Sequence, residues 1–186
     1  SLPDCIRLAY LPSPGKIRLR LSAKGSERKQ LEEAVDKAID QLYPLIGDNI
    51  FGFDDQKPEE ELIRLLKAKS ATIACAESCS GGYLSHLFTS VPGASEVFNG
   101  SVVAYSNSVK AGVLGVDTGL IEQHGAVSRE VVEAMAQGAI RITGSDYAIS
   151  NSGIAGPTGG SDEKPVGTVW IAWASKDKVL SRRFLF

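Results

Sequence analysis

The sequence predicts an α/β protein, in which a layered α/β domain follows a small N-terminal module. From about residue 58 onward, short apolar runs alternate with segments whose apolar residues recur every three or four positions, which is the pattern of strands alternating with helices. Before that point, two runs of alternating hydrophobicity precede one amphipathic segment. The length of 186 residues suits one domain plus a small module.

The first 55 residues predict a module of βαβ type. Alternating hydrophobicity over 6–10 and again over 16–21 indicates two strands, joined by a turn at 12–15. Ser26 is a candidate N-cap for a helix that reaches about residue 42. The short apolar run 50–53 predicts a further strand.

The second predicted strand has a basic face, formed by Lys16, Arg18 and Arg20. Such a face is either solvated or a nucleic-acid surface, and the solvated interpretation is favoured. The formal net charge of −2 argues against a general nucleic-acid surface and makes a nucleic-acid partner unfavoured.

Residues 56–186 predict the layered domain, after a linker that ends near Pro58. The expected elements, in order, are a helix from Pro58 to near Lys69, a strand over 71–76, a helix over 80–90, a strand over 100–105, a short helix from about Ser106, a helix capped by Ser128, a strand over 146–151, a glycine-rich loop over 153–160 and a strand over 167–174. The sequence ends at Phe186 inside a strand-like run, so we expect the domain to continue into a further helix.

The composition excludes several classes of protein. It is 43% hydrophobic and 23% charged, as in ordinary globular proteins, and no apolar run approaches about 20 residues, so we expect no membrane span. Three cysteines do not form a disulfide framework, which favours a reducing, cytoplasmic location. Two histidines without a CxxC or HExxH motif predict no metal site.

Ser78 is the most informative residue, because it stands where a strand should turn into a helix. Gly81 and Gly82 follow it, and the first amides of a helix can bind an anion. Ser78 is therefore a helix cap or a nucleophile, and the residues alone leave the two about equal. His86 and His124 belong to no recognisable triad motif, and Cys79 as a nucleophile has no matched histidine.

Two further segments can contribute to the same site. Lys110 is expected in the first turn of a short helix, where the helix dipole and partial burial would lower its pKa and make it a base for a serine, with Tyr105 nearby; a solvated lysine is the favoured alternative. The glycine-rich loop 153–160 follows a strand and can present backbone amides to a phosphate or carboxylate, although it is not a P-loop. Loops after parallel strands meet at one sheet edge.

Taken together, these segments resemble the C-terminal domain of the competence/damage-inducible protein CinA, the nicotinamide-nucleotide amidohydrolase family. The resemblance covers about residues 58–186. It rests on Ala76–Gly82, Tyr105–Asn107 with Lys110, His124–Ser128, Ser152–Pro157 and Lys164–Thr168. Residues 1–55 resemble the small KH-like module that precedes this domain in CinA.

The resemblance implies a three-layer α/β/α fold with a mixed sheet and deamidation of nicotinamide mononucleotide to nicotinic acid mononucleotide and ammonia. Ser78 matches the nucleophile, Lys110 the base and Tyr105 an assisting hydroxyl, with no metal or cofactor. The expected partners are a small-molecule nucleotide and a second copy of the chain, with no membrane. Substrate contacts are expected from Glu77, Cys79, Ser80, Gly81, Gly82, Asn107, Ser152, Gly153, Ala155, Gly156, Pro157, Gly159 and Gly160.

The sequence departs from the family in two places: position 80 is Ser where Thr is common, and relatives continue beyond position 186. Two other functions remain open. One is a nucleotide- or phosphate-binding module without hydrolysis, and the other is a DNA-associated protein that acts through the basic strand.

Overall fold

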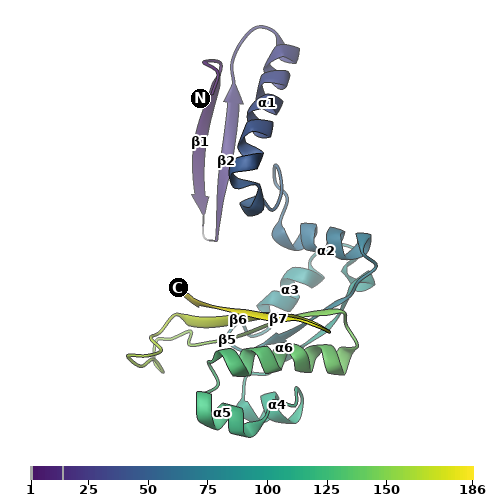
Figure 1. Ribbon diagram of the computed structural model, residues 1–186, viewed down its shortest axis with the longest axis vertical. Coiled ribbons are helices and arrows are strands. Elements are labelled where there is room, and N and C mark those ends of the chain that lie inside the picture. The colour runs from purple at the N-terminus through teal and green to yellow at the C-terminus, as the bar shows by residue number, and fades with distance from the viewer. Residues whose placement is uncertain (1, 14) are drawn as a thin grey trace. The chain divides into compact units, whose positions relative to one another are not determined.

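The computed structural model describes residues 2–13 and 15–186 (Figure 1). The chain divides into two compact units, one that ends at Asp54 and one that begins at Asp55. Each unit is described by itself.

The first unit is a hairpin with one long helix. Strands β1 (Ile6–Ser13) and β2 (Lys16–Ala23) pair antiparallel, with Leu8 opposite Leu21. Helix α1 (Arg28–Ile46) follows, and the 3₁₀ turn η1 (Gly47–Asn49) ends it. The alternation of leucines with basic residues gives the hairpin one apolar face, as the sequence predicts. The predicted turn between the strands includes Pro14, which lies outside the described residues.

Two predictions for this unit are wrong. Residues 50–53 form no strand: the run is short and contains Gly52, which weakens a strand, and the ring of Phe53 stacks on Tyr43 of α1 at 6.4 Å between centroids. The helix is capped at Glu27, without a side-chain hydrogen bond, rather than at Ser26. The unit is therefore ββα rather than βαβ in the part of the chain that is described.

The second unit is built around a mixed sheet. Among the described residues, its five strands lie in the order β4 (Phe98–Val103), β3 (Ile73–Glu77), β5 (Tyr147–Gly153), β6 (Thr168–Ser175) and β7 (Val179–Leu185). β3 runs parallel to both β4 and β5, whereas β6 and β7 are antiparallel to their neighbours. β3 is buried along its whole length, as expected for a central strand covered on both faces.

Helices cover both faces of this sheet, which confirms the three-layer α/β/α prediction (Figure 1). On one face, Ile73 and Cys75 of β3 pack against α2 (Pro58–Ala68) and α3 (Tyr83–Thr89). On the other face, Ala74 and Ala76 pack against α6 (Arg129–Thr143). Because successive strand residues point to opposite faces, this alternation places Glu77 on the α3 side.

The remaining elements are short. They are η2 (Ala94–Glu96), α4 (Asn107–Gly112) and α5 (Thr118–His124). Sequence analysis missed α5, although Asp117 caps it by accepting from the amide of Gly119 at 2.6 Å, a signal that Asp-Thr-Gly carries. No helix within the described residues has the length and apolar character that crossing a bilayer requires.

Candidate active site

The site lies where β3, β4 and β5 end, because the carboxyl ends of parallel strands open at the same sheet edge. Ser78 directly follows β3, Lys110 lies on α4 after β4, and Asn151 is near the end of β5. All three side chains are buried. Residues far apart in the sequence thus meet at one edge.

A tight turn joins β3 to α3 behind Ser78. Gly81 and Gly82 adopt φ angles of 60° and 102°, which side chains with a Cβ rarely adopt, so the paired glycines are required here. The Gly81 amide donates to the Ser78 carbonyl at 3.1 Å. The helix itself begins at Tyr83, three residues later than the sequence predicts, because the glycines form the turn rather than the first helical residues.

The carboxylate of Glu77 holds this turn from inside. One oxygen accepts from the hydroxyl of Ser80 at 2.7 Å and from the amides of Gly82 and Leu84 at 3.2 and 2.9 Å. The other accepts from the amide of Ser85 at 2.8 Å and from its hydroxyl. The carboxylate therefore fills the N-terminus of α3 as an anion would.

Glu77 is fully buried, yet its pKa lies below the ordinary value. Burial raises the pKa of this carboxyl, but the hydrogen bonds from Ser85, Ser80 and the backbone amides of the turn outweigh burial and favour the ionised form. The side chain thus carries a negative charge where the sequence suggested a binding site for a ligand anion.

Ser78 and Lys110 form a buried pair in direct contact. Nζ of Lys110 lies 3.1 Å from Oγ of Ser78, and it donates to the carbonyls of Ala104 at 2.8 Å and Tyr105 at 3.2 Å. No carboxylate within the described residues forms an ion pair with this lysine. The cation would therefore be buried without a counter-ion.

Burial lowers the pKa of Lys110, while an ionised Cys79 thiol would raise it. The sequence suggested the helix dipole as a further cause, but α4 has only six residues and Lys110 belongs to its last turn. A neutral amine has two N–H groups and one lone pair. In the protonated form, Nζ donates to Oγ of Ser78 as well as to the carbonyls of Ala104 and Tyr105. In the neutral form, the two N–H groups suffice for the two carbonyls, and the lone pair can accept the hydroxyl proton of Ser78, as a general base does.

The amides of the turn are divided among different acceptors. The Ser78 amide donates to Oδ1 of Asn151 at 3.2 Å. Among the described residues, no oxygen accepts a hydrogen bond from the amides of Cys79 and Ser80. These two amides are the donors that remain for a ligand beside Ser78.

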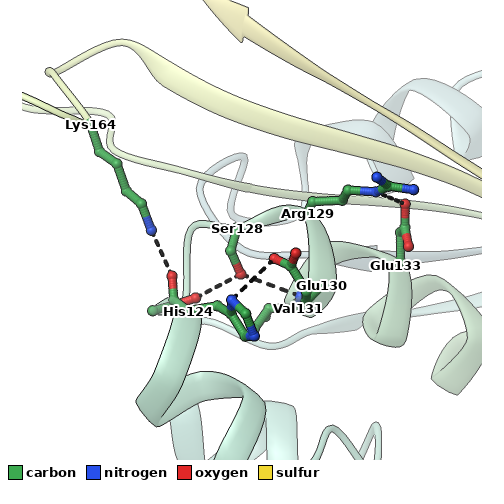
Figure 2. A network of polar contacts seen from close by, with 8 residues as sticks. His124, Ser128, Arg129, Glu130, Val131, Glu133 and Lys164 are labelled. Carbon is green, nitrogen blue, oxygen red and sulfur yellow. Dashed lines mark hydrogen bonds and ion pairs between the residues drawn. The ribbon is translucent and has the colours of Figure 1, made fainter.

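The glycine-rich loop between β5 and β6 is exposed over residues 155–163 and tied down at its ends. Lys164 reaches across to the carbonyl of His124 at the end of α5, at 2.6 Å, as Figure 2 shows. Ser152, next to Asn151, donates to the carbonyl of Ala126 at 2.8 Å. The loop, the α5–α6 turn and the Ser78 turn are therefore connected by direct contacts.

Comparison with known proteins identifies the family to which this chain belongs. A family model described as the CinA C-terminal domain matches residues 55–186. The chain belongs to the CinA C-terminal domain family. A second family model, described as the damage-inducible protein CinA KH domain, matches residues 3–52. The resemblance inferred from the motifs is confirmed.

Named CinA relatives align along most of the chain. A CinA-like protein of Cytophaga hutchinsonii is 46% identical over 181 residues, which is 97% of this chain and 43% of that protein. A CinA-like protein of Thermotoga maritima is 50% identical over 155 residues, 83% of this chain and 37% of that protein. The chain spans less than half the length of these curated relatives.

Solved structures of CinA-type proteins share the fold. The competence damage-inducible protein A of Klebsiella pneumoniae is 36% identical, with a TM-score of 0.67 over 69% of this chain and 80% of that one. A CinA superfamily protein of Escherichia coli is 31% identical, with a TM-score of 0.67 over 76% of this chain and 85% of that one.

The CinA domain brings some predicted site residues together and keeps others apart. Ser78, Lys110 and Ser80 lie in one contact network, in which Asn151 links Ser78 to Ser80. Tyr105, in contrast, is 73% exposed, and its carbonyl is the group that contacts Lys110. Asn107 is exposed at the start of α4. The roles of these residues remain predictions.

The glycine-rich residues are also split by the structure. Ser152 is buried and Gly153 lies against Cys79, since a Cβ on Gly153 would be 3.0 Å from its sulfur. The exposed members of the predicted set in this loop are Ala155, Gly156, Pro157, Gly159 and Gly160.

The alternative nucleophiles are not favoured by this geometry. Burial raises the pKa of Cys79, whose thiol donates to Oδ1 of Asn151 at 3.4 Å, so it is no activated thiolate. The ring of His86 is tilted by 35° against that of Tyr83, with centroids 6.2 Å apart, and His124 faces Glu130 at 3.8 Å. Cys75 is buried in the core.

Sequence reasoning missed Asn151. No pattern distinguished it from other polar residues at a strand end, and its partner residues lie about 70 positions away in the sequence. The described residues contain no cluster of His, Cys, Asp and Glu that could hold a metal ion.

Proposed function

We propose that this CinA domain hydrolyses the carboxamide of nicotinamide mononucleotide to nicotinic acid mononucleotide and ammonia, with Ser78 as nucleophile and Lys110 as base. The observation that carries the proposal is the 3.1 Å contact between Nζ of Lys110 and Oγ of Ser78, in a buried pair whose lysine has a lowered pKa. The family resemblance supplies the substrate, and the geometry supports the mechanism.

In the first step, the lone pair of Lys110 accepts the proton of the Ser78 hydroxyl while Oγ attacks the carboxamide carbon. The carbonyl oxygen gains the negative charge and is stabilised by the amides of Cys79 and Ser80. Removing one such donor typically costs about 10²–10³ in rate. Because Lys110 now carries the proton, it is placed to protonate the leaving nitrogen, and the C–N bond breaks to release ammonia.

In the second step, a water molecule takes the place of ammonia beside Lys110. The neutral amine accepts a proton from this water as the water oxygen attacks the acyl carbon. The proton then returns to Oγ of Ser78 as the ester bond breaks. One lysine thus acts as base and acid in turn, as histidine does in serine hydrolases.

The phosphate of the nucleotide belongs at the glycine-rich loop rather than at the start of α3. The charged Glu77 already accepts from the amides of Gly82, Leu84 and Ser85, and a dianion there would meet a buried carboxylate of the same sign. The loop between β5 and β6 instead offers exposed backbone and the cation of Lys164 at its base.

The test is release of ammonia from nicotinamide mononucleotide by the wild type, by S78A and by K110A, with nicotinamide and glutamine as comparison substrates. K67A is the control, because Lys67 pairs with Glu96 on the surface. We expect both site variants to lose at least about 10²-fold in rate and K67A to match the wild type. Wild-type rates in S78A or K110A would refute the assigned roles, and tight nucleotide binding without turnover in the wild type would favour a binding module.

A further inference from the structure

Asn151 links β5 to three consecutive residues of the Ser78 turn. Its Oδ1 accepts from the amide of Ser78 at 3.2 Å and from the thiol of Cys79 at 3.4 Å. Its Nδ2 donates to Oγ of Ser80 at 2.8 Å. Asn151 is only 7% exposed, so water has little access to compete for these hydrogen bonds.

The orientation of this amide is fixed by the proton inventory of its neighbours. The hydroxyl of Ser80 lies 2.7 Å from the ionised Glu77 carboxylate and 3.0 Å from Oδ1 of Asn151. Its single proton goes to the charged acceptor, which forms the stronger bond, so Ser80 accepts from Nδ2 of Asn151 at 2.8 Å. Nδ2 therefore faces Ser80, and Oδ1 faces the amide of Ser78. Glu77, Ser80, Asn151 and Ser78 form a directed chain in which every proton has a single acceptor.

These hydrogen bonds determine which amides of the turn remain available to a ligand. Asn151 takes the amide of Ser78, and Glu77 takes those of Gly82, Leu84 and Ser85. The amides of Cys79 and Ser80 are left over. Without the Asn151 side chain, the Ser78 amide would lose its acceptor and the turn would lose three hydrogen bonds to β5. The two remaining donors would then no longer be held in place.

We infer that Asn151 is a positioning residue for the reaction at Ser78: it anchors the turn to β5 so that the amides of Cys79 and Ser80 converge on the developing oxyanion. The inference rests on the proposed function, because it concerns the same nucleophile. Asn151 contacts no reacting atom and acts through Ser78 and Ser80.

Three variants test this role. N151L keeps the approximate shape and removes both bonds, whereas N151D keeps an acceptor for Ser78 and removes the donor to Ser80. S150A is the matched control, because Ser150 is the neighbouring residue of β5 and its hydroxyl donates to Val132 on the opposite sheet face at 2.6 Å. We expect kcat to fall about 10- to 100-fold in N151L with KM nearly unchanged, and S150A to retain its kcat.

The pH dependence of N151D separates positioning from general support of the fold. A protonated aspartic acid can donate to Ser80 and accept from Ser78 as the amide does, and an ionised one cannot. The titratable groups that share the network are Glu77 and Cys79, with Lys110 across Ser78; the charge of Glu77 raises the pKa of the new carboxyl. The ratio of N151D to wild-type kcat should therefore rise as pH falls. A ratio that does not change with pH, in a protein that melts like the wild type, overturns the inference.

A second readout keeps this inference separate from the choice of substrate. Phosphonylation of Ser78 by a fluorophosphonate probe, with S78A as the blank, places an oxygen where the oxyanion would lie. We expect N151L and N151D to react about 10- to 100-fold more slowly than the wild type and S150A. If the wild type is labelled but does not release ammonia from nicotinamide mononucleotide, the proposed substrate is wrong and Asn151 is still tested. Equal labelling rates in all variants would overturn the positioning role. If N151L does not fold, the labelling rate of N151D alone tests that role.

Discussion

Glu77→Gln is the substitution that tests the architecture of the Ser78 turn most sharply. Glutamine has the same shape, but one of the two acceptor oxygens becomes an amide nitrogen. In the less costly orientation, the glutamine oxygen still accepts the hydrogen bonds from Ser80, Gly82 and Leu84. The glutamine nitrogen then faces the buried amide of Ser85, which is left without an acceptor.

The expected loss of stability follows from these contacts. An unpaired buried donor costs about 1–3 kcal/mol, and loss of a negative charge at a helix N-terminus costs about 1 kcal/mol more. The three remaining bonds also weaken, because they no longer go to a charged acceptor. The free energy of unfolding should fall by about 3–5 kcal/mol, a large share of the 5–15 kcal/mol that is typical of a domain.

Urea denaturation at neutral pH measures this difference. Glu96→Gln is the matched control, because Glu96 is exposed and pairs with Lys67 at 2.8 Å; surface pairs of this kind contribute about 0–1 kcal/mol. A loss in E77Q no larger than that in E96Q would refute the account of the turn.

The pH dependence of the same measurement checks the ionisation of Glu77. Its pKa in the native state is below the ordinary value, so its stabilisation is fully present above the pKa of the unfolded chain, about 4.3, and is lost as pH falls through the lower native pKa. The gap between wild type and E77Q should therefore narrow in acid. A gap that stays constant would show that Glu77 is not ionised in the native protein.

Three further predictions follow from other contacts. The kcat for ammonia release should rise with pH through the lowered pKa of Lys110, because only the neutral amine accepts the proton of Ser78. For the same reason, K110R should lose at least about 10²-fold in rate. A flat pH profile of the wild-type kcat, with chemistry rate-limiting, contradicts this prediction. Gly138→Ala in α6 should lower the free energy of unfolding in urea by about 1–3 kcal/mol, although alanine favours helices, because its Cβ would lie 2.2 Å from the carbonyl oxygen of Leu114; a more stable variant would be contrary evidence. Lys164→Met should raise KM for the nucleotide severalfold and hasten proteolysis within residues 155–163, because it removes the hydrogen bond that holds the loop to His124. K176M serves as the control. Unchanged KM and an unchanged proteolysis rate would count against a role for this hydrogen bond.

Local signals in the sequence predict much of the second unit. Ser128 caps α6, as expected, by accepting from the amide of Val131 at 3.3 Å, and Pro58 begins α2. The strand, paired glycines and helix around Ser78 follow from residues that are adjacent in the chain. Such features depend on neighbours within one turn, so sequence patterns report them well.

What the sequence could not predict depends on contacts between distant segments. Lys110 and Ser78 are 32 positions apart, and the residues alone favoured a solvated lysine until the family resemblance was considered. No sequence pattern indicates that Glu77 is buried, because its hydrogen-bond partners come from a turn that folds over it. In the first unit, the run 50–53 has the composition of a strand, but Phe53 stacks on α1 instead, a choice that only tertiary packing decides.

The most direct test of the central claim is the identity of the residue that becomes acylated during turnover. Enzyme mixed with nicotinamide mononucleotide is quenched in acid before steady state, digested and examined by mass spectrometry, in the wild type, S78A and C79A. We expect an adduct of substrate minus ammonia on Ser78 in the wild type and C79A, and none in S78A. An adduct on Cys79, or ammonia release by S78A at the wild-type rate, would contradict it.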